Sequence, residues 1–432
     1  MNAGKNVINT IIVSCALFAF FLGLFGAGGL ILSPAIGLET GREWASAFLG
    51  FVMSGALLPI LAFLAVVRAG GAEGIASEMG KIFSILFTSV VMLCTLLSAV
   101  YELGIVTAFE PIPQFLTSCA FFAVALYLSL NLSTAVETVG KYLAPILIII
   151  MTVIIVKGVL NPLDIPVDTG IPRVYALRSG LIGGYRTMDV YGGLVFSGAI
   201  IAAVAARQLD TQRTRIVITY GCAAVAGLGL VFIYGGLIYL GATGSSLFGA
   251  PMGNTVLLTG LIDALFKGFG PYGLAFTMIL ACLSAAVGLT AGASHFFSNV
   301  TKGKLSYKAC VAVICAASLL LSAMEIDAIT HCAAQLLVFI YPAAVVLVLL
   351  NVFRCRIIIN RGTFIGAVYG ALAVGFLEML PENFMPHVSS ALRLLPFYVD
   401  GFAWAVPAIA CGIFGTLCCA LLRLYKKEPE GA

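Results

Sequence analysis

Long apolar runs separated by short polar segments dominate this sequence. A helix needs about 20 apolar residues to cross the hydrocarbon core of a bilayer. Runs of that kind predict twelve membrane-spanning helices, at residues 10–36, 46–68, 82–109, 115–131, 141–160, 183–206, 214–242, 271–298, 307–323, 329–350, 362–380 and 397–424. The first run is too long for a cleaved signal peptide, so we expect it to remain as the first span.

Composition indicates that lipid is the solvent of most of the chain. Of the 432 residues, 61% are hydrophobic and 10% are charged, with a mean hydropathy of +1.10. Ordinary soluble domains are about 45–50% apolar and about 25% charged. The prediction is an all-α polytopic membrane protein. Its twelve cysteines form no CxxC pair and lie mostly within apolar runs, as small buried hydrophobic residues do.

The basic residues predict the orientation of the spans. Lys and Arg concentrate on the cytoplasmic side of membrane proteins. With twelve spans and a cytoplasmic N-terminus, the inner segments hold sixteen of the 23 Lys and Arg residues. We therefore expect a multi-pass protein of the inner (plasma) membrane with both termini in the cytoplasm. The net charge of +4 is small and scattered, which argues against a nucleic-acid partner.

Glycines interrupt two of the predicted spans. The interrupting residues are Gly23, Gly26, Gly28, Gly29 and Pro34 in the first, and Gly192, Gly193, Ser197 and Gly198 in the sixth. Unwound backbone at membrane depth survives only where it is buried in protein or lines a cavity, although glycine also serves close helix packing. The two segments are five spans apart, so they hold the same position in two halves of opposite orientation. Paired interruptions of this kind are typical of a transporter site between inverted repeats.

The expected organisation is one transmembrane transporter domain over residues 1–432. Repeat one covers about 10–160, repeat two about 183–350, and two extra helices about 362–424. The polar gaps at 161–182 and 243–270 lie outside the membrane. They are either caps over an entrance or plain connectors. Gly362, Gly366 and Gly370 form a GxxxGxxxG motif, which we expect to pack helices or a dimer.

Four blocks resemble a known family. They are GLETGREWASAFLGFVMSGALLPILAFLAVVRAGG (37–71), GGYRTMDVYGGLVF (183–196), GFGPYGLAFTMILACLSAAVGLTAGASHFFSN (268–299) and YPAAVVLVLLN (341–351). In this order they resemble the bacterial branched-chain amino acid:cation symporters. The resemblance implies a leucine-transporter-like fold, with a 5+5 inverted-repeat core and discontinuous helices 1 and 6. It also implies sodium-coupled import of leucine, isoleucine and valine by alternating access.

The same resemblance implies where the substrate binds. Half-helix N-termini attract carboxylates, so backbone amides of the first span are expected to hold the carboxylate of the amino acid. Carbonyls and hydroxyls of the sixth span are expected to meet its ammonium group, and aromatic rings its aliphatic side chain. The candidate substrate-binding residues are Ala27, Gly28, Gly29, Tyr101, Val195, Phe196 and Ser197.

A sodium ion is expected between the first and eighth spans of a leucine-transporter-like protein. The candidate ligands are the carbonyls of Leu22, Phe25 and Val287 and the hydroxyls of Thr290 and Ser294. Alternatively, Thr290 bonds the carbonyl four residues earlier in its own helix. A coupling cation is the expected partner of the amino acid, with no further cofactor.

Two departures from the family pattern leave the substrate and the ion open. Gly29 stands where members usually have asparagine, and Tyr101–Glu102 stands where they tend to carry Pro-Arg. Ionisable residues within spans are functional candidates by default. Glu102 is therefore a candidate proton-coupling carboxylate or ligand of the substrate amine, or else part of a structural ion pair. Arg186 and Asp189, three residues apart, are expected to neutralise each other near the outer surface.

Other classes of function are less well supported. The alternative to sodium symport is proton-coupled transport of another amino acid. A channel would need a filter of carbonyls or charged rings, and the sequence has no repeated filter motif. An enzyme would need clustered His, Cys or acidic residues, whereas the three histidines are scattered. We therefore predict a transporter that is not an enzyme.

Overall fold

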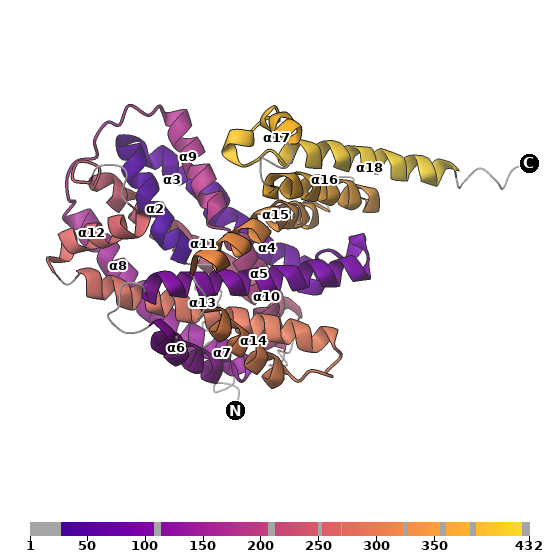
Figure 1. Cartoon of the computed structure of the whole chain (residues 1–432), viewed down its shortest axis with the longest axis horizontal. Helices are drawn as coiled ribbons and strands as arrows, with labels where there is room; N and C mark the ends of the chain where they lie inside the picture. The colour runs from indigo at the N-terminus through magenta and orange to yellow at the C-terminus, as the bar shows by residue number, and fades with distance from the viewer. Residues whose placement is uncertain are drawn as a thin grey trace, which may run out of the picture. The chain divides into compact units, whose positions relative to one another are not determined.

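The computed structural model describes residues 27–107, 114–205, 212–248, 253–268, 270–322, 326–354, 360–380 and 386–425 (Figure 1). Within these ranges the regular structure is helical and contains no β-strand. Six helical stretches are long and apolar enough to cross a membrane, and six shorter apolar helices accompany them. The predicted all-α class is confirmed.

Within the described residues each predicted span coincides mainly with helix; residues 10–26 of the first span, and 108–109, 206 and 323 of three others, lie outside them. These helices are α2 (Ala27–Thr40), α3 (Trp44–Phe51), α4 (Leu57–Ala69), α5 (Lys81–Thr107), α6 (Gln114–Ser129), α7 (Leu132–Thr138), α8 (Ala144–Leu160), α9 (Arg173–Arg186), α10 (Asp189–Ala205), α11 (Gln212–Thr243), α13 (Gly270–Val300), α14 (Tyr307–Ser322), α15 (Ile326–Phe353), α16 (Arg361–Met379) and α18 (Ala405–Tyr425). Single π-helical segments, Val52–Ala56 and Val139–Leu143, join α3 to α4 and α7 to α8.

Two further helices lie in segments that the sequence left without structure. They are α12 (Asn254–Phe266) and α17 (Pro386–Arg393). α12 falls within the polar gap at 243–270 and contacts α2 and α13. Its residues Leu257, Leu258 and Leu261 are fully buried. At thirteen residues it is shorter than a membrane span, which is why a search for long apolar runs misses it.

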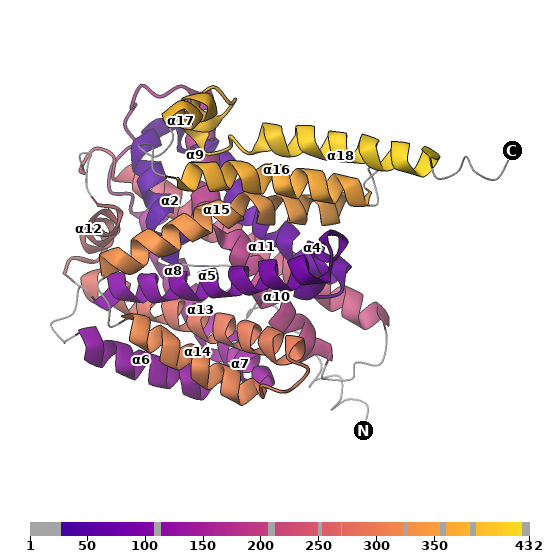
Figure 2. The same cartoon turned by 45° about the vertical axis from the view of Figure 1, so that its right-hand side comes forward.

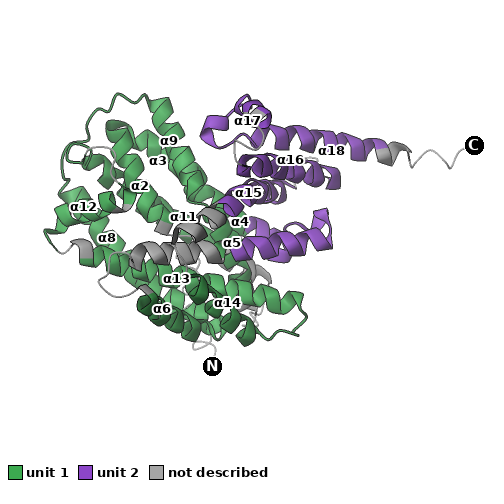
Figure 3. Cartoon of the chain, in the orientation of Figure 1, with its two compact units in different colours: residues 1–63, 95–326 green, residues 64–94, 327–432 purple. Residues whose placement is uncertain are grey.

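Residues 1–63 and 95–326 form one compact unit (Figure 3). In it, α2 packs on α11 and α3 packs on α9. Glycines allow these helices to approach closely: a Cβ at Gly37 or Gly241 would overlap backbone of the facing helix, at Ile238 and Pro34. Small residues at such crossings are typical of membrane helices. The sequence interpretation that glycine serves helix packing therefore applies to this part of α2.

Pro34 does not interrupt the first span. α2 continues from Ala27 through Pro34 to Thr40. The hydroxyl of Ser33 donates to the Gly29 carbonyl at 2.6 Å, and the Pro34 carbonyl lies against Gly241. Neighbouring helices and hydroxyl groups commonly stabilise a proline within a membrane helix. The helix is therefore continuous at Pro34, while Gly23 and Gly26, at the middle of the predicted span, lie outside the described residues.

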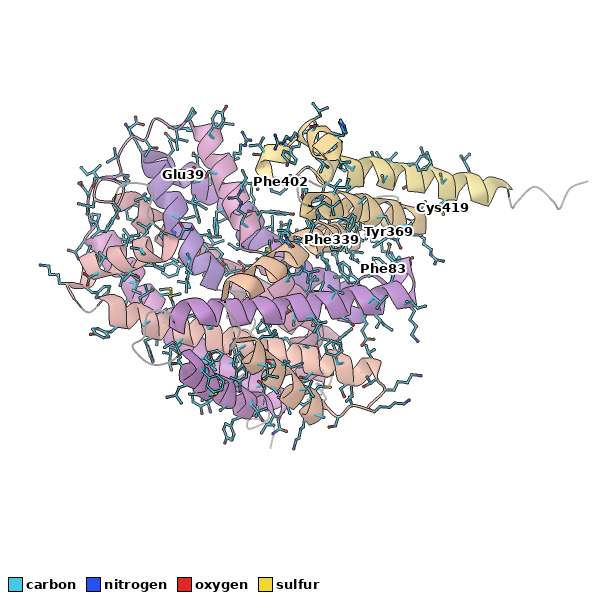
Figure 4. All side chains as sticks on the ribbon, viewed as in Figure 1. Glu39, Phe83, Phe339, Tyr369, Phe402 and Cys419 are labelled. Carbon is cyan, nitrogen blue, oxygen red and sulfur yellow. The ribbon has the colours of Figure 1, made fainter. Side chains whose placement is uncertain are left out.

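The second unit comprises residues 64–94 and 327–432. Within it α16 and α18 run side by side (Figures 1 and 2). Side chains added at Gly362, Gly366 and Gly370 would meet backbone of α18. The GxxxGxxxG motif therefore packs two helices of the same chain. The rings of Phe83 on α5 and Tyr369 on α16 also meet edge to face, with centroids 5.8 Å apart (Figure 4).

The connection between α4 and α5 is held by polar contacts within the second unit. Asn351, near the end of α15, donates to the Ile75 carbonyl at 2.8 Å. Arg354 pairs with Glu78, and Arg361 at the start of α16 donates to the Glu78 carbonyl at 3.1 Å. These contacts fix the connection to the ends of α15 and α16.

Candidate functional site

The sixth predicted span is broken into two helices. α9 ends at Arg186 and α10 begins at Asp189, so Thr187 and Met188 lie between them. Met188 has φ +56°, which a non-glycine residue adopts rarely and at a cost of about 1–3 kcal/mol. The hydroxyl of Thr187 donates to the Gly184 carbonyl at 2.8 Å and so bonds the last turn of α9. The discontinuity of helix 6 is thus confirmed.

The break lies before the glycines that suggested it. Gly193 is helical, and a Cβ there would lie 2.6 Å from the carbonyl oxygen of Pro59 on α4. Its own carbonyl accepts a hydrogen bond from Ser197. The glycine at position 193 therefore serves the contact between α10 and α4. The expectation of a break in the middle of the glycine-rich segment was wrong by several residues.

The first turn of α2 lies against this break. A Cβ at Gly28 would be 3.7 Å from the carbonyl oxygen of Thr187. The amides of Ala27, Gly28 and Gly29 belong to this turn. These residues of the first span therefore lie beside the break in the sixth, where the sequence predicts the substrate carboxylate; the residues before Ala27 lie outside the described part of the chain.

Gly29 faces an aromatic ring of α11. A Cβ at Gly29 would lie 2.5 Å from the hydroxyl oxygen of Tyr234 and 2.6 Å from its ring. Tyr234 is completely buried and stacks edge to face on Phe51, with ring centroids 4.9 Å apart. The ring has little room to move, so position 29 accepts only glycine while Tyr234 keeps this place.

Tyr234 also holds a buried carboxylate. Its hydroxyl donates to Oδ2 of Asp189 at 2.8 Å, and Asp189 is only 8% exposed. Arg186 is exposed on the last turn of α9, and within the described part of the chain it forms no ion pair with Asp189. The expected neutralisation of Arg186 by Asp189 was wrong, because the break turns the two residues onto different helices.

The sequence did not single out Tyr234. Its segment, Tyr234-Gly235-Gly236, looks like any glycine-rich part of a membrane helix. The one local signal is indirect, because a glycine such as Gly29 leaves room that a large side chain elsewhere must fill. Only the crossing of α2 and α11 shows which side chain that is.

Three candidate substrate-binding residues belong to α10 and lie where this helix contacts α13. Val195, Phe196 and Ser197 are all buried. The ring of Phe196 covers Gly288 of α13, and Val195 covers Gly292. Val195 is six residues into α10, about 9 Å along the helix axis from its first residue. Their role in binding the substrate stays a prediction.

The candidate sodium ligands of α13 differ in their surroundings. The Val287 carbonyl accepts a hydrogen bond from Ser129 at 3.4 Å. The hydroxyl of Thr290 has the Cys315 thiol of α14 as a hydrogen-bonding neighbour. The Ser294 hydroxyl is fully buried and has no hydrogen-bond partner among the described residues. A buried hydroxyl of this kind is costly unless something binds it.

The remaining candidates are described only in part. Leu22 and Phe25 lie outside the described residues. Tyr101 and Glu102 belong to α5, and the structure describes their backbone but not their side chains. The predicted roles of these four residues therefore stay predictions.

Known proteins resemble the chain over most of its length. A family model described as "Branched-chain amino acid transport protein" matches residues 6–422. The branched-chain amino acid permease BraB of Bacillus subtilis is 30% identical over 98% of each chain. The branched-chain amino acid transport system 2 carrier protein of Pseudomonas aeruginosa is 31% identical over 94% of each chain. The permease BrnQ of Escherichia coli strain K12 is 29% identical over 91% of each chain.

Solved transporter structures share the fold. Mhp1, a nucleobase-cation-symport-1 family transporter in a closed conformation, matches with a TM-score of 0.56 and 14% identity, over 95% of this chain and 93% of Mhp1. A manganese transporter of Eremococcus coleocola matches with a TM-score of 0.54 and 15% identity, over 96% of this chain and 95% of that protein. The leucine-transporter-like fold is confirmed, and the protein is a multi-pass membrane transporter, not an enzyme. The chain belongs to the branched-chain amino acid transport protein family.

Proposed function

We propose that this protein is a sodium-coupled symporter that imports leucine, isoleucine and valine by alternating access, with both termini in the cytoplasm. The names of its relatives, branched-chain amino acid permeases and carriers, support the substrate class. The observation that carries the proposal is the contact between the first turn of α2 and the break at Thr187–Met188. Paired interrupted spans are typical of a substrate site in secondary transporters.

The first turn of α2 is suited to a carboxylate. Anions are stabilised at helix N-termini by the backbone amides and by the helix dipole. A branched aliphatic side chain needs an apolar surface beside this turn. Apolar pockets separate leucine from valine by only about 1–3 kcal/mol per methylene group. We therefore propose overlapping selectivity among the three branched-chain amino acids.

Sodium coupling draws its support from α13. Hard cations prefer oxygen ligands. The hydroxyl of Ser294 on this helix is buried and has no hydrogen-bond partner among the described residues. Thr290 lies one turn away on the same face. We propose that both hydroxyls serve the coupling ion, with the carbonyls of Val287, Leu22 and Phe25 as further ligands.

Uptake into proteoliposomes tests the proposal. The purified protein is reconstituted, and labelled leucine uptake is followed with an inward sodium gradient and with choline in place of sodium at matched pH. We expect accumulation above equilibrium only with the sodium gradient. Accumulation driven by a proton gradient without sodium would contradict sodium coupling and favour the proton-coupled alternative. Uptake of another amino acid but of none of leucine, isoleucine and valine would contradict the substrate class.

A further inference from the structure

The carbonyl end of α6 lies against the middle of α13. α6 ends at Ser129, which is fully buried, and the hydroxyl oxygen of Ser129 lies 3.4 Å from the carbonyl oxygen of Val287. Both helices belong to the first unit, where they pack together beside α14 (Figure 2). Val300, the last residue of α13, lies 13 residues beyond Val287, about 20 Å farther along the helix axis. α6 therefore ends level with the interior of α13 and not with its end.

A helix end at this depth is electronegative. The last four carbonyl groups of an α-helix have no partner within the helix, and they carry partial negative charge. At the end of α6, the carbonyl of Ser129 accepts a hydrogen bond at 2.9 Å from the hydroxyl of Tyr307, the first residue of α14. Helices that end inside a membrane transporter commonly direct their carbonyl ends at a cation. The end of α6 is suited to the same use.

The Ser129 hydroxyl lies farther from the Val287 carbonyl than an ordinary hydrogen bond requires. A hydroxyl oxygen usually lies about 2.5–3.0 Å from the oxygen that accepts its proton. Two oxygens that bind one cation lie farther apart. Oxygens at the Ca²⁺ distance of about 2.3–2.6 Å, at right angles around the ion, are about 3.3–3.7 Å from each other. Because Na⁺ has nearly the same radius as Ca²⁺, the observed 3.4 Å fits two ligands of one sodium ion.

Thr290 adds a third neutral oxygen. It follows Val287 by three residues on α13, so its hydroxyl is within reach of the Val287 carbonyl. The Cys315 thiol of α14 is its hydrogen-bonding neighbour, and a sulfur that accepts the hydroxyl proton leaves the oxygen lone pairs for a cation. Among the described residues no three His, Cys, Asp or Glu side chains gather as a metal site. Neutral oxygens suit a monovalent cation, whereas Ca²⁺ and Mg²⁺ sites usually contain carboxylates.

We propose that the hydroxyl of Ser129 is a further ligand of the coupling cation, which it binds together with the Val287 carbonyl and the Thr290 hydroxyl. Tyr307 is a positioning residue, because its hydrogen bond holds the end of α6 in place. When the cation binds, the Ser129 proton turns to a carbonyl three or four residues earlier in α6, as serines in helices commonly do. The inference rests on the proposed sodium coupling, and it adds α6 and α14 to the helices around the ion.

The sodium dependence of leucine binding tests this inference on the purified full-length protein. Equilibrium binding of labelled leucine is titrated with sodium, with choline keeping the ionic strength constant. The affinity for leucine is then measured at saturating sodium. For Ser129→Ala we expect the half-maximal sodium concentration to rise by about tenfold or more, because a contact with a charged group is lost. Leucine affinity at saturating sodium should change by less than about twofold, because the variant still reaches the same sodium-bound state.

Further variants keep the test specific to the oxygen atom. Ser129→Cys replaces a hard oxygen by a soft sulfur of similar shape, so it should also raise the half-maximal sodium concentration, by about tenfold. Tyr307→Phe keeps every proposed ligand and should raise it by only about threefold. Ser118→Ala makes the matched change at another buried serine of α6, about 16 Å away, and should leave it unchanged. If Ser129→Ala is not folded by size-exclusion chromatography, Ser129→Cys decides.

Three results would overturn the inference. The first is an unchanged half-maximal sodium concentration in folded Ser129→Ala and Ser129→Cys. The second is an equal rise for Ser118→Ala. The third is a loss of leucine affinity at saturating sodium with the sodium dependence unchanged, which would leave Ser129 only a packing role. If the unmodified protein bound leucine equally well without sodium, or bound no leucine, the proposed function would fail instead, so the two failures are distinguishable.

Discussion

At the scale of single residues, Gly29 and Tyr234 fit as a pair. The tyrosine ring takes the space that any side chain at position 29 would need. Gly28, the neighbouring glycine, has its nearest contact at 3.7 Å, which is ordinary van der Waals contact. The structure therefore leaves room for a side chain at position 28 but not at position 29.

Alanine substitutions at these two glycines are expected to change the free energy of unfolding by different amounts. Gly29→Ala forces a methyl group into the buried Tyr234 ring and should reduce the free energy of unfolding by about 1–3 kcal/mol. Gly28→Ala should change it by much less. Thermal unfolding of the detergent-solubilised variants measures both effects. Equal melting temperatures for the two variants would contradict the described place of Tyr234.

Ser294 offers a second test at the residue scale. Ser294→Ala removes a buried hydroxyl without a hydrogen-bond partner among the described residues, so the change should not reduce stability. As a sodium ligand, however, its loss should raise the sodium concentration for half-maximal leucine uptake by about tenfold.

The matched control for Ser294 lies on the same helix. Ser284 is also buried on α13, but its hydroxyl donates to the Ala281 carbonyl at 2.7 Å. Ser284→Ala should leave the sodium dependence unchanged. A sodium dependence of Ser294→Ala equal to that of the unmodified protein would remove Ser294 from the ion site.

At the scale of helices, the break between α9 and α10 shows where sequence interpretation was limited. Glycine content correctly indicated that the sixth span is interrupted, but the predicted interruption lies several residues after the observed one. Gly193 is committed to the contact with Pro59, while the break itself contains Thr187 and Met188. Glycines for packing and glycines for unwinding look alike in a sequence, because the difference depends on which helix lies opposite.

The turn between α2 and α3 depends on Gly41. Gly41 has φ +47°, and a Cβ there would overlap the carbonyl oxygen of Val167 in the connection between α8 and α9. The next amide, that of Arg42, donates to the same carbonyl at 2.9 Å, and Val167 in turn donates to the Ser245 hydroxyl at 3.0 Å. Arg173 and Glu43 add a salt bridge at 3.2 Å. This segment therefore ties together the ends of three helices.

Gly41→Ala should destabilise the protein through both strain and overlap. Gly170 provides the control, because it has φ +70° but no atom within 4 Å of its added Cβ. Gly170→Ala should cost only the conformational strain of about 1 kcal/mol, and Gly41→Ala should cost clearly more. Thermal unfolding compares them. A larger loss for Gly170→Ala would contradict the contact with Val167.

At the scale of the whole chain, length and hydropathy predicted most of the fold. Within the described residues the predicted apolar runs are mainly helical, because crossing a bilayer demands a fixed length of apolar helix. The helix α12 was not predicted because, at thirteen residues, it is shorter than a membrane span. The link between Asp189 and Tyr234 could not be predicted, since 45 residues separate them and only the packing of α11 brings them together.

The central claim is that the amino acid binds where the first turn of α2 meets the start of α10. Hydrogen–deuterium exchange, followed by mass spectrometry on the unmodified protein with and without saturating leucine, tests it most directly. Because a bound ligand protects the amides that it contacts, we expect leucine to slow exchange in peptides covering Ala27–Leu30 and Thr187–Tyr191. Exchange in α16 and α18 should not change. Protection confined to other helices, with both of these segments unchanged, would contradict the account.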